Sequence, residues 1–481
     1  MLSNISTIMY TDVVGYSKLT GDNQEIALII LEEHNQILKE YTTKYSGKIA
    51  KLTGDGLCAL FDKPINGIRC AVDIQIALDD RNQLNTKERQ IQIRIGLHYG
   101  AYEHKDGDVF GDGINVAKSI EPIAPYGGIA ISDTLNNLIW DKGDIYIREY
   151  KMLQLGEDEI KIYEVFLNLI VWIKNSNKQK VQILDSQTMY IKAHQFFHAG
   201  DYSSAIKFAT LALNSMKEKK LEIQSFICHA LISIGELDYA KEIIKELKIK
   251  SKDDLDLQSH LYKMSGHLKL NSKDLDSALQ SFIKSLELMQ TLNGKYINEL
   301  IYNICIIFLY KDEEEKISDF LNQIIDMQND QYLILLKGIQ TLVIDYKNDS
   351  KLLEYIDSIK QLENSHLIAF ALKIATLVYM KIENYDEAKE TIKKAQKMLK
   401  NSAENISDFY QRKFFLERVY VNKDIMNFSH KISEYFVQIT YKEIKEENIE
   451  SNIIIESNFC TNCGFENKKK FKFCVSCGNA L

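Results

Sequence analysis

The fold of this chain is decided by the stretch Tyr10-Thr-Asp12-Val-Val-Gly15-Tyr-Ser17, which directly follows a short β-rich run, Ser6–Tyr10. A second aspartate, Asp55, occupies the tip of a Gly-Asp-Gly turn between two further β-rich runs. If the two strands are neighbours, both carboxylates lie at one edge of a sheet. Mg²⁺ prefers few carboxylates together with phosphate oxygens, and backbone N–H groups near Gly15 are free to hold phosphates. The pattern predicts a Mg²⁺ site that binds a nucleoside triphosphate.

The distribution of glycine and proline divides the chain into three regions. Residues 1–166 hold 15 of the 22 glycines and all three prolines, whereas residues 167–458 hold five glycines and no proline. Since glycine and proline are frequent in turns, we expect many turns in the first region and long helices in the second. Residues 459–481 hold a cluster of four cysteines. With 481 residues, the chain is long enough for two or three domains.

In residues 1–166, short β-rich runs alternate with helical patterns, which predicts an α+β sheet with helices packed on one face. The expected strands are Ser6–Tyr10, Lys48–Leu52, Leu57–Phe61, Gln90–Tyr99, Gly128–Ser132, Tyr146–Leu155 and Ile160–Phe166. The expected helices are Asn23–Tyr45, Ile65–Asn82 and Asn115–Ile123.

Charge and hydropathy exclude several classes of protein. A net charge of −8 argues against a general nucleic-acid binder. The apolar run Val165–Ile173 is far shorter than the ~20 residues that cross a bilayer, and the first residues lack the pattern of a secretory signal. We therefore expect a cytoplasmic protein with no membrane partner. Four scattered cysteines are expected to be inert core residues, namely Cys58, Cys70, Cys228 and Cys305.

A short sequence motif, called the phrase below, recurs in the second region. Ala199-Gly-Asp-Tyr-Ser-Ser-Ala205 returns 35 residues later as Ile234-Gly-Glu-Leu-Asp-Tyr-Ala240, and again in Lys273–Ala278 and Glu383–Ala388. A polar turn followed by a small alanine that opens a second helix is typical of helix–turn–helix repeats. Residues 186–450 therefore resemble tetratricopeptide repeats, an all-α solenoid, with residues 167–185 as a linker; an irregular helical bundle is the alternative. Such surfaces usually hold peptides or proteins, so we expect a regulatory arm with an unidentified protein or peptide partner.

Three motifs, taken together, resemble the catalytic domain of class III adenylate/guanylate cyclases. They are Asp12-Val-Val-Gly15-Tyr-Ser17, then Lys51-Leu-Thr-Gly54-Asp55, then Asp108-Val-Phe-Gly111-Asp-Gly-Ile-Asn115. Their order and spacing match the family over roughly residues 5–166, so the resemblance makes residues 1–166 the catalytic domain and implies an α+β ferredoxin-like fold. The implied reaction is attack of the ribose 3′-oxygen on the α-phosphorus of ATP, with pyrophosphate leaving.

The resemblance assigns roles residue by residue. Asp12 and Asp55, assisted by the backbone carbonyl of Val13, match the ligands of two Mg²⁺ (or Mn²⁺) ions. The residues expected to contact substrate near them are Val14, Gly15, Tyr16, Ser17 and Gly54. Lys51 and Asp108 match the pair that reads adenine. Asn115 matches a transition-state asparagine supplied by the other subunit, which implies a head-to-tail homodimer.

Two positions depart from the family's pattern. The family expects an arginine at position 119, where this chain has Ser119, and the nearest cation is Lys118. It also expects a triphosphate-binding lysine in the last hairpin, where Gln154 falls in register and Lys151 and Lys161 lie nearby. Two alternatives to an adenylate cyclase remain open: a degenerate cyclase that acts as a nucleotide-binding scaffold, and a cyclase that makes another cyclic nucleotide.

The four C-terminal cysteines form two CxxCG motifs, Cys460/Cys463 and Cys474/Cys477, separated by ten residues. Four thiolates suit a closed tetrahedral Zn²⁺ site of structural type. Residues 459–481 therefore resemble a short zinc ribbon with one Zn²⁺, and a redox CxxC function is the alternative.

Overall fold

The computed structural model describes residues 4–16, 24–52, 54–105, 107–176, 185–216, 219–251, 254–292, 294, 296–324, 330–433, 457–459 and 466–468. The chain forms two compact units. The first comprises residues 1–231 with 406–409, and the second comprises residues 232–405 with 410–481.

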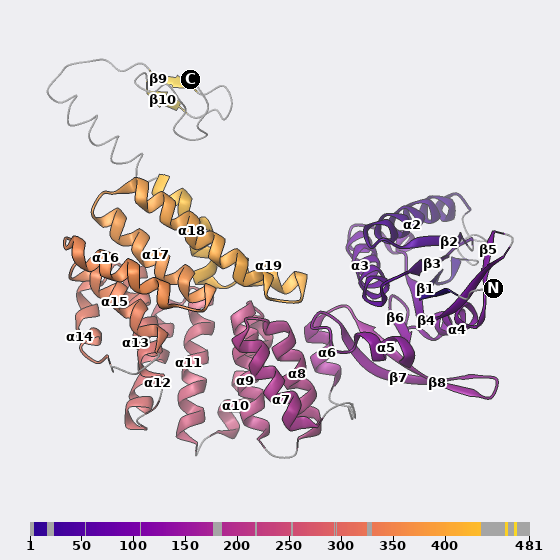
Figure 1. The fold of residues 1–481 in the computed structure, drawn as a ribbon, viewed down its shortest axis with the longest axis horizontal. Coiled ribbons are helices and arrows are strands. Elements are labelled where there is room, and N and C mark those ends of the chain that lie inside the picture. Colours follow the sequence, from indigo (N-terminus) through magenta and orange to yellow (C-terminus); the bar gives the residue numbers. More distant parts are fainter. Residues whose placement is uncertain are drawn as a thin grey trace. The chain divides into compact units, whose positions relative to one another are not determined.

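A mixed β-sheet forms the centre of the first unit (Figure 1). Its strand order is β2-β3-β1-β4-β6-β8-β7, with the short β5 paired to β4 beside this path. The pairs are antiparallel except β4 with β6, which is parallel. The strands are β1 (Asn4–Val13), β2 (Lys48–Leu52), β3 (Leu57–Phe61), β4 (Ile93–Lys105), β5 (Asp108–Phe110), β6 (Ile129–Ser132), β7 (Tyr146–Leu155) and β8 (Asp158–Phe166).

Helices cover both faces of this sheet. Ile8 and Leu60 pack with residues of α4, whereas Met9 and Phe61 pack with residues of α2 and α3. The expectation that helices pack on one face is therefore wrong. Successive side chains of a strand point to opposite faces, and both sets are apolar in β1 and β3, so each face needs its own cover. The helical segments around the sheet are α2 (Gln24–Lys44), α3 (Pro64–Gln83), η1 (Lys87–Arg89), α4 (Asp112–Ile120), η2 (Glu121–Ile123) and α5 (Asp133–Ile139).

The segment expected to be a linker contains a helix. Residues 169–176 form α6 (Leu169–Ser176), which contacts β7 and β8. Trp172 anchors it, because its side chain is fully buried and its Nε1 donates to the backbone oxygen of Ile147 at 2.9 Å. The first unit continues through α7 (Ser186–His198) and α8 (Tyr202–Ser215) into α9 (Lys220–Ile234).

One buried lysine joins the first helix pair to the loop that follows α5. Lys207 of α8 is 2% exposed, and its Nζ donates to the backbone oxygens of Trp140, Lys142 and Ile145 at 2.5, 2.6 and 2.6 Å. Burial lowers the pKa of Lys207 to about 7. The three acceptors match the three N–H donors of the ammonium form. The pair α7–α8 therefore packs as part of the same unit as the sheet.

The second unit consists, up to residue 433, of helices that follow one another in sequence (Figure 1). The helix pairs α11–α12 and α17–α18 each pack closely, and α12 continues onto α13. The helical segments are α10 (Leu237–Lys250), α11 (Leu255–Asn271), α12 (Leu275–Thr291), α13 (Ile297–Tyr310), η3 (Glu314–Lys316), α14 (Ile317–Leu321), α15 (Gln331–Val343), α16 (Asp349–Ser358), η4 (Ile359–Gln361), α17 (Ser365–Lys381), α18 (Tyr385–Glu404) and α19 (Phe409–Glu417). Residues 420–433 are also helical.

The phrase that recurs in the sequence forms the same turn at three of its four occurrences. A residue with positive φ ends one helix, and the next residue's N–H bonds back to a carbonyl five residues earlier, which closes the helix end. Asp201, Asp274 and Asn384 bond in this way to the carbonyls of residues 196, 269 and 379 at 2.9 Å, and their side chains cap the following helix. The predicted helix–turn–helix units are confirmed at these turns, whereas membership of the tetratricopeptide family stays a prediction.

The C-terminal segment is described only at β9 (Ser457–Phe459) and β10 (Glu466–Lys468), which pair antiparallel. The predicted zinc ligands Cys460, Cys463, Cys474 and Cys477 lie outside the described residues. In the part of the chain that the structure describes, no helix is both long enough and apolar enough to span a bilayer.

Replacing the ammonium of Lys207 tests whether it holds the first helix pair on the sheet. We expect Lys207→Met to lower the free energy of unfolding by about 3 kcal/mol, because three buried carbonyls lose their donor. Urea unfolding of the full chain measures this change. Lys241→Met, at an exposed position of α10, should leave the unfolding free energy within about 0.5 kcal/mol of the parent. Equal effects of the two substitutions would contradict the role of Lys207.

Candidate active site

Asp12 lies near the end of β1, in the middle of the sheet. The register of β1 with β4 sets Asp12 opposite Arg94, and the Arg94 Nη2 donates to Asp12 Oδ2 at 2.7 Å. On its other side Arg94 forms an ion pair with Glu121, with 2.8 Å between Nε and Oε1. One guanidinium therefore links two carboxylates from β1 and from the segment after α4.

A glycine makes room for this arrangement. Gly96 lies on β4 two residues after Arg94, and a Cβ built there would lie 2.3 Å from the backbone nitrogen of Glu121. No side chain fits at that distance, so only glycine lets the start of η2 lie directly on β4. This close approach brings the Glu121 carboxylate within reach of Arg94.

Asp55 lies in the turn between β2 and β3, and β3 is the direct neighbour of β1. Burial raises the pKa of Asp55 and the negative charge of Asp12 adds to this effect. Burial also raises the pKa of Glu121 to about 7, against the opposing effect of Arg94 and with added contributions from Asp12 and Asp55. Three carboxyl groups thus share one region of negative potential that a single arginine does not neutralise.

These residues fit a site for divalent cations that phosphate completes. The coupling of Asp12 and Asp55 is the observation that supports it, because a cation between like charges relieves their repulsion. Within the described ranges, no group of three or more His, Cys, Asp or Glu residues forms a closed metal site. A cation here would therefore rely on two carboxylates and take its other ligands from phosphate oxygens and water, as Mg²⁺ does.

Lys51 and Asp108 come together, as the resemblance implied. Lys51 Nζ donates to Asp108 Oδ2 at 2.5 Å, and the second carboxylate oxygen accepts the N–H of Val109 at 2.8 Å. The hydrogen bond from Lys51 lowers the pKa of Asp108. The side chains are 49% and 29% exposed, so a ligand can reach both.

An irregularity in β2 decides the direction of Lys51. Ile49 pairs with Ala59 of β3, but Lys51 rather than the intervening Ala50 pairs with Cys58. Such a β-bulge places one extra residue in a strand. It puts Lys51 on the sheet face of Cys58, the face that α4 covers and on which Asp108 lies.

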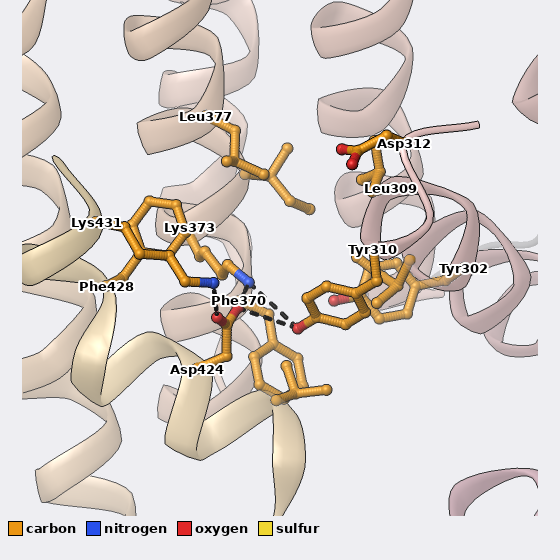
Figure 2. Close-up of a pocket in the computed structure, with 13 residues that line it drawn as sticks. Tyr302, Leu309, Tyr310, Asp312, Phe370, Lys373, Leu377, Asp424, Phe428 and Lys431 are labelled. Carbon is orange, nitrogen blue, oxygen red and sulfur yellow. Dashed lines mark hydrogen bonds and ion pairs between the residues drawn. The ribbon is translucent and has the colours of Figure 1, made fainter. Parts of the chain in front are cut away.

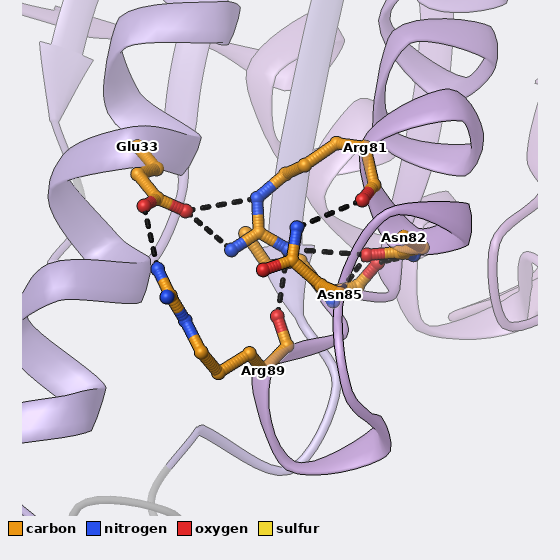
Figure 3. Close-up of polar contacts among 6 residues, drawn as sticks. Glu33, Arg81, Asn82, Asn85 and Arg89 are labelled. Carbon is orange, nitrogen blue, oxygen red and sulfur yellow. Dashed lines mark hydrogen bonds and ion pairs between the residues drawn. The ribbon is translucent and has the colours of Figure 1, made fainter.

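A cluster of ion pairs and hydrogen bonds holds the segment just before β4 against α2 and α3 (Figure 3). Glu33 of α2 accepts from Arg81 Nε at 2.9 Å and from Arg89 Nη2 at 2.8 Å. Arg81 also donates to the backbone oxygen of Arg89 at 2.6 Å, and Asn82 pairs with the backbone of Ile91 at 2.7 and 2.8 Å. Because Arg94 follows three residues later, this cluster fixes the strand from which Arg94 reaches Asp12.

The predicted transition-state residues lie on α4. Asn115 and Lys118 are exposed, while Ser119 is partly buried and its hydroxyl donates to the backbone oxygen of Asn115 at 2.8 Å. The opposite side of α4 is buried against the sheet. These side chains therefore face away from the domain core.

The remaining predicted residues lie at the end of β1, in the turn between β2 and β3, on the β7–β8 hairpin, or outside the described residues. Val13 ends β1, and the N–H of Val14 bonds to the oxygen of Gln92 at 2.8 Å. Gly15 and Gly54 have φ values of 74° and 91°, which favour glycine. Tyr16 is partly buried and packs on the core of the sheet domain, and Ser17 lies outside the described residues. Gln154 is exposed on the β7–β8 hairpin, and its Nε2 donates to the oxygen of Gly156 at 3.0 Å.

Sequence reasoning missed Arg94, Glu121 and His34. His34 of α2 is fully buried, and burial lowers its pKa to about 4 while the charge of Asp12 opposes that shift. Arg94 could have been found as the one cation among the apolar residues that begin β4. Glu121 could not, because its approach depends on Gly96.

Comparison with known proteins agrees with this geometry. Residues 3–167 match the family described as the adenylate and guanylate cyclase catalytic domain. The predicted class III cyclase domain is thus supported for the first third of the chain. The match ends before the helix pairs and the C-terminal cysteines, so it does not test the tetratricopeptide or zinc-ribbon predictions.

The curated relatives match the same region. Putative adenylate cyclase 3 of Rhizobium meliloti (strain 1021) is 31% identical over 169 residues, which is 35% of this chain and 28% of that protein. Serine/threonine-protein kinase pkn2 of Myxococcus xanthus is 26% identical over 131 residues, 27% of this chain and 16% of that protein. The chain therefore spans less than a third of the length of either relative.

Solved structures are similar over a comparable stretch. An adenylate/guanylate cyclase/hydrolase from Silicibacter pomeroyi is 28% identical with a TM-score of 0.32, over 34% of this chain and 97% of that chain. The adenylyl cyclase CyaB from P. aeruginosa is 21% identical with a TM-score of 0.31, over 34% of this chain and 96% of that chain.

The ion chain Asp12–Arg94–Glu121 can be tested by a double-mutant cycle. We expect Arg94→Gln to lower the free energy of unfolding by about 1–3 kcal/mol, because Glu121, at 12% side-chain exposure, loses its ionic partner. Adding Glu121→Gln should restore much of this loss, since no buried charge is then left alone. Urea unfolding of metal-free protein measures all four corners of the cycle, and strictly additive effects would contradict the coupling.

Proposed function

We propose that this chain is an adenylate cyclase that converts ATP to 3′,5′-cyclic AMP and pyrophosphate. The observation that carries the proposal is the pair Lys51–Asp108 on the same sheet as the coupled carboxylates Asp12 and Asp55. The family match of residues 3–167 supports the reaction class, and the likeness to a putative adenylate cyclase supports ATP as substrate.

Adenine suits the chemistry of the pair. An ammonium can donate to a ring nitrogen of adenine, while a carboxylate accepts from its exocyclic amine. Guanine carries a carbonyl oxygen where adenine has this amine, so a carboxylate at that edge finds no donor. The two side chains bond to each other at 2.5 Å, so both lie where a base edge would contact them.

The carboxylates and the backbone around them would bind the triphosphate. Asp12 and Asp55, with the Val13 carbonyl, would hold two Mg²⁺ or Mn²⁺ ions, which supply positive charge to the phosphates and acidify the 3′-hydroxyl. Arg94 holds Asp12 in a fixed direction through their 2.7 Å hydrogen bond. Val14, Gly15, Tyr16, Ser17 and Gly54 would contact the phosphates through the loop and turn beside the carboxylates.

A second copy of the chain would complete the site. Asn115 and Lys118 are exposed on the outer side of α4, where another subunit can reach them. In this proposal Asn115 of one subunit orients the ribose bound by the other, and Lys118 provides the cation that the family places at position 119. The enzyme then acts as a homodimer in the cytoplasm.

The rest of the chain would regulate or dock this enzyme. The recurring helix pairs are of the kind that binds a protein or peptide partner, and Lys207 fixes the first of them to the cyclase sheet. The spacing Cys460/Cys463 and Cys474/Cys477 supports one structural Zn²⁺ at the C-terminal end.

Ser119 favours a second candidate function. Its hydroxyl is bonded within its own helix and carries no charge to offer a phosphate. If Lys118 cannot take over, the domain binds ATP without turning it over and the chain is a nucleotide-dependent scaffold. Product formation distinguishes the two functions.

A product assay with four triphosphates tests the enzyme proposal. We expect the full chain, with Mg²⁺ or Mn²⁺, to form cyclic AMP from ATP faster than it forms the cyclic nucleotides of GTP, CTP or UTP. Asp55→Asn should lower the rate by at least about a hundredfold, because a metal ligand becomes neutral. Asp62→Asn, an exposed aspartate just after β3, is the matched control and should retain parental activity. An Asp55→Asn variant as active as the control would sink the assignment.

Mixing two inactive variants tests the shared site. Asp55→Asn and Asn115→Ala homodimers should each be inactive. After subunit exchange of equal amounts, about a quarter of the parental activity should return, since half the dimers are mixed and each holds one intact site. No recovery, with subunit exchange verified by differently tagged copies, would show that both residues serve the same subunit's site.

A further inference from the structure

A cavity in the second unit has the features of a small-molecule site (Figure 2). Its volume is about 300 Å³, at the lower end of pockets that bury small ligands. Side chains from α13, α17 and the helical residues 420–433 line it. All of these lie in one compact unit, far along the sequence from the cyclase domain.

The cavity holds a charged cluster that the helix packing does not require. Lys373 and Asp424 form a buried ion pair, with side chains 10% and 7% exposed. Tyr310 donates to the same Asp424 oxygen at 3.2 Å, and Lys431 binds the other oxygen at 2.8 Å. Figure 2 shows these four groups meeting at one point. A buried ion pair adds little stability over apolar packing, whereas such clusters in pockets are common at functional sites.

The cluster has more hydrogen-bond donors than acceptors. Both oxygens of Asp424 are engaged, by Lys373 and Tyr310 on one side and by Lys431 on the other. Lys431 uses one of its three N–H groups within the described residues, and Lys373 uses two. The second carboxylate of the lining, Asp312, is exposed and lies away from this cluster (Figure 2). At the buried end of the cavity two ammonium groups therefore face one carboxylate, and a further negative group that accepts hydrogen bonds would fit there.

A tyrosine lies beside this cluster. Tyr302 of α13 lines the cavity and is 4% exposed. In Figure 2 its ring points from α13 toward the side of the cavity that carries Lys373 and Asp424. A hydroxyl on the wall of the cavity can donate a hydrogen bond to a ligand.

The remaining walls suit a flat apolar body. The rings of Phe370 and Phe428 line the cavity together with aliphatic side chains of α13 and α17. Lys373 and Lys431 lie 5.3 and 5.4 Å from the ring centre of Phe428, which leaves the aromatic surface beside the charged end. Lys431 is 57% exposed, so it can turn from Asp424 to an incoming ligand.

We propose that this cavity binds a small aromatic carboxylate, with the ring between Phe370 and Phe428 and the carboxylate on Lys431, Lys373 and Tyr302. Binding exchanges one contact of Lys431 with Asp424 for a contact with the ligand. The site belongs to the helical arm, so the proposal stands independently of the cyclase reaction.

Three probes that share one ring system test the proposal on the full-length protein. Isothermal titration calorimetry should show that indole-3-acetate binds at least about tenfold more tightly than indole-3-acetamide or tryptamine, since only the acid provides the missing charge. Preference for tryptamine, equal binding of all three probes, or no binding of the acid up to millimolar concentration would overturn the proposal.

Two mild substitutions locate the site. Lys431→Gln at the exposed rim should weaken indole-3-acetate binding about tenfold, and Tyr302→Phe, which removes one oxygen only, should weaken it severalfold. Lys397→Gln and Tyr379→Phe, which lie outside the cavity, are the matched controls and should bind like the parent. Thermal unfolding of each variant verifies folding. Unchanged binding in both Lys431→Gln and Tyr302→Phe would place the acid elsewhere and refute the proposed site.

Discussion

The pairing of β1 with β4 is the constraint on which the candidate active site depends. The two strands pair over ten consecutive residues, and β1 pairs with β3 on its other side. This register brings Asp12 opposite Arg94, although the two are 82 residues apart in sequence. It also sets Gly96 beneath Glu121. A shift of one residue in this register would place Asp12 and Arg94 on opposite faces of the sheet, so the packing of the apolar residues and the ion pair depend on the same register.

Strands and helices with a strong local sequence pattern could be predicted from the sequence alone. The hairpin strands Lys48–Leu52 and Leu57–Phe61 were predicted with the bounds they have, because alternation and a Gly-Asp-Gly turn agree there. The short β5 and the helices α5 and α6 were not predicted, since three to eight residues carry too little periodicity. The pair Lys51–Asp108 was found through the family resemblance, whereas Glu121 depends on tertiary approach that no local pattern encodes.

The helical part shows why the sequence pattern identified some of the repeated turns and not others. The turns at Asp201, Asp274 and Asn384 were recognised by the alanine four residues after the capping residue, each of which is fully buried. A further turn of the same kind occurs at Glu313, whose N–H bonds to the oxygen of Phe308 at 3.0 Å. There the fourth residue is Ile317, equally buried. The turn at Glu313 has the same backbone geometry but isoleucine in place of alanine, so a search for alanine does not find this turn.

The bulge at Ala50 has a consequence for how this domain tolerates change in length. Because the bulge supplies one residue more than regular pairing needs, deleting Ala50 would leave Lys51 opposite Cys58 and on the same face of the sheet. The strand could therefore lose this residue and keep the contact of Lys51 with Asp108. Inserting a residue between Ala50 and Lys51 in a regularly paired strand would instead turn the ammonium to the other face.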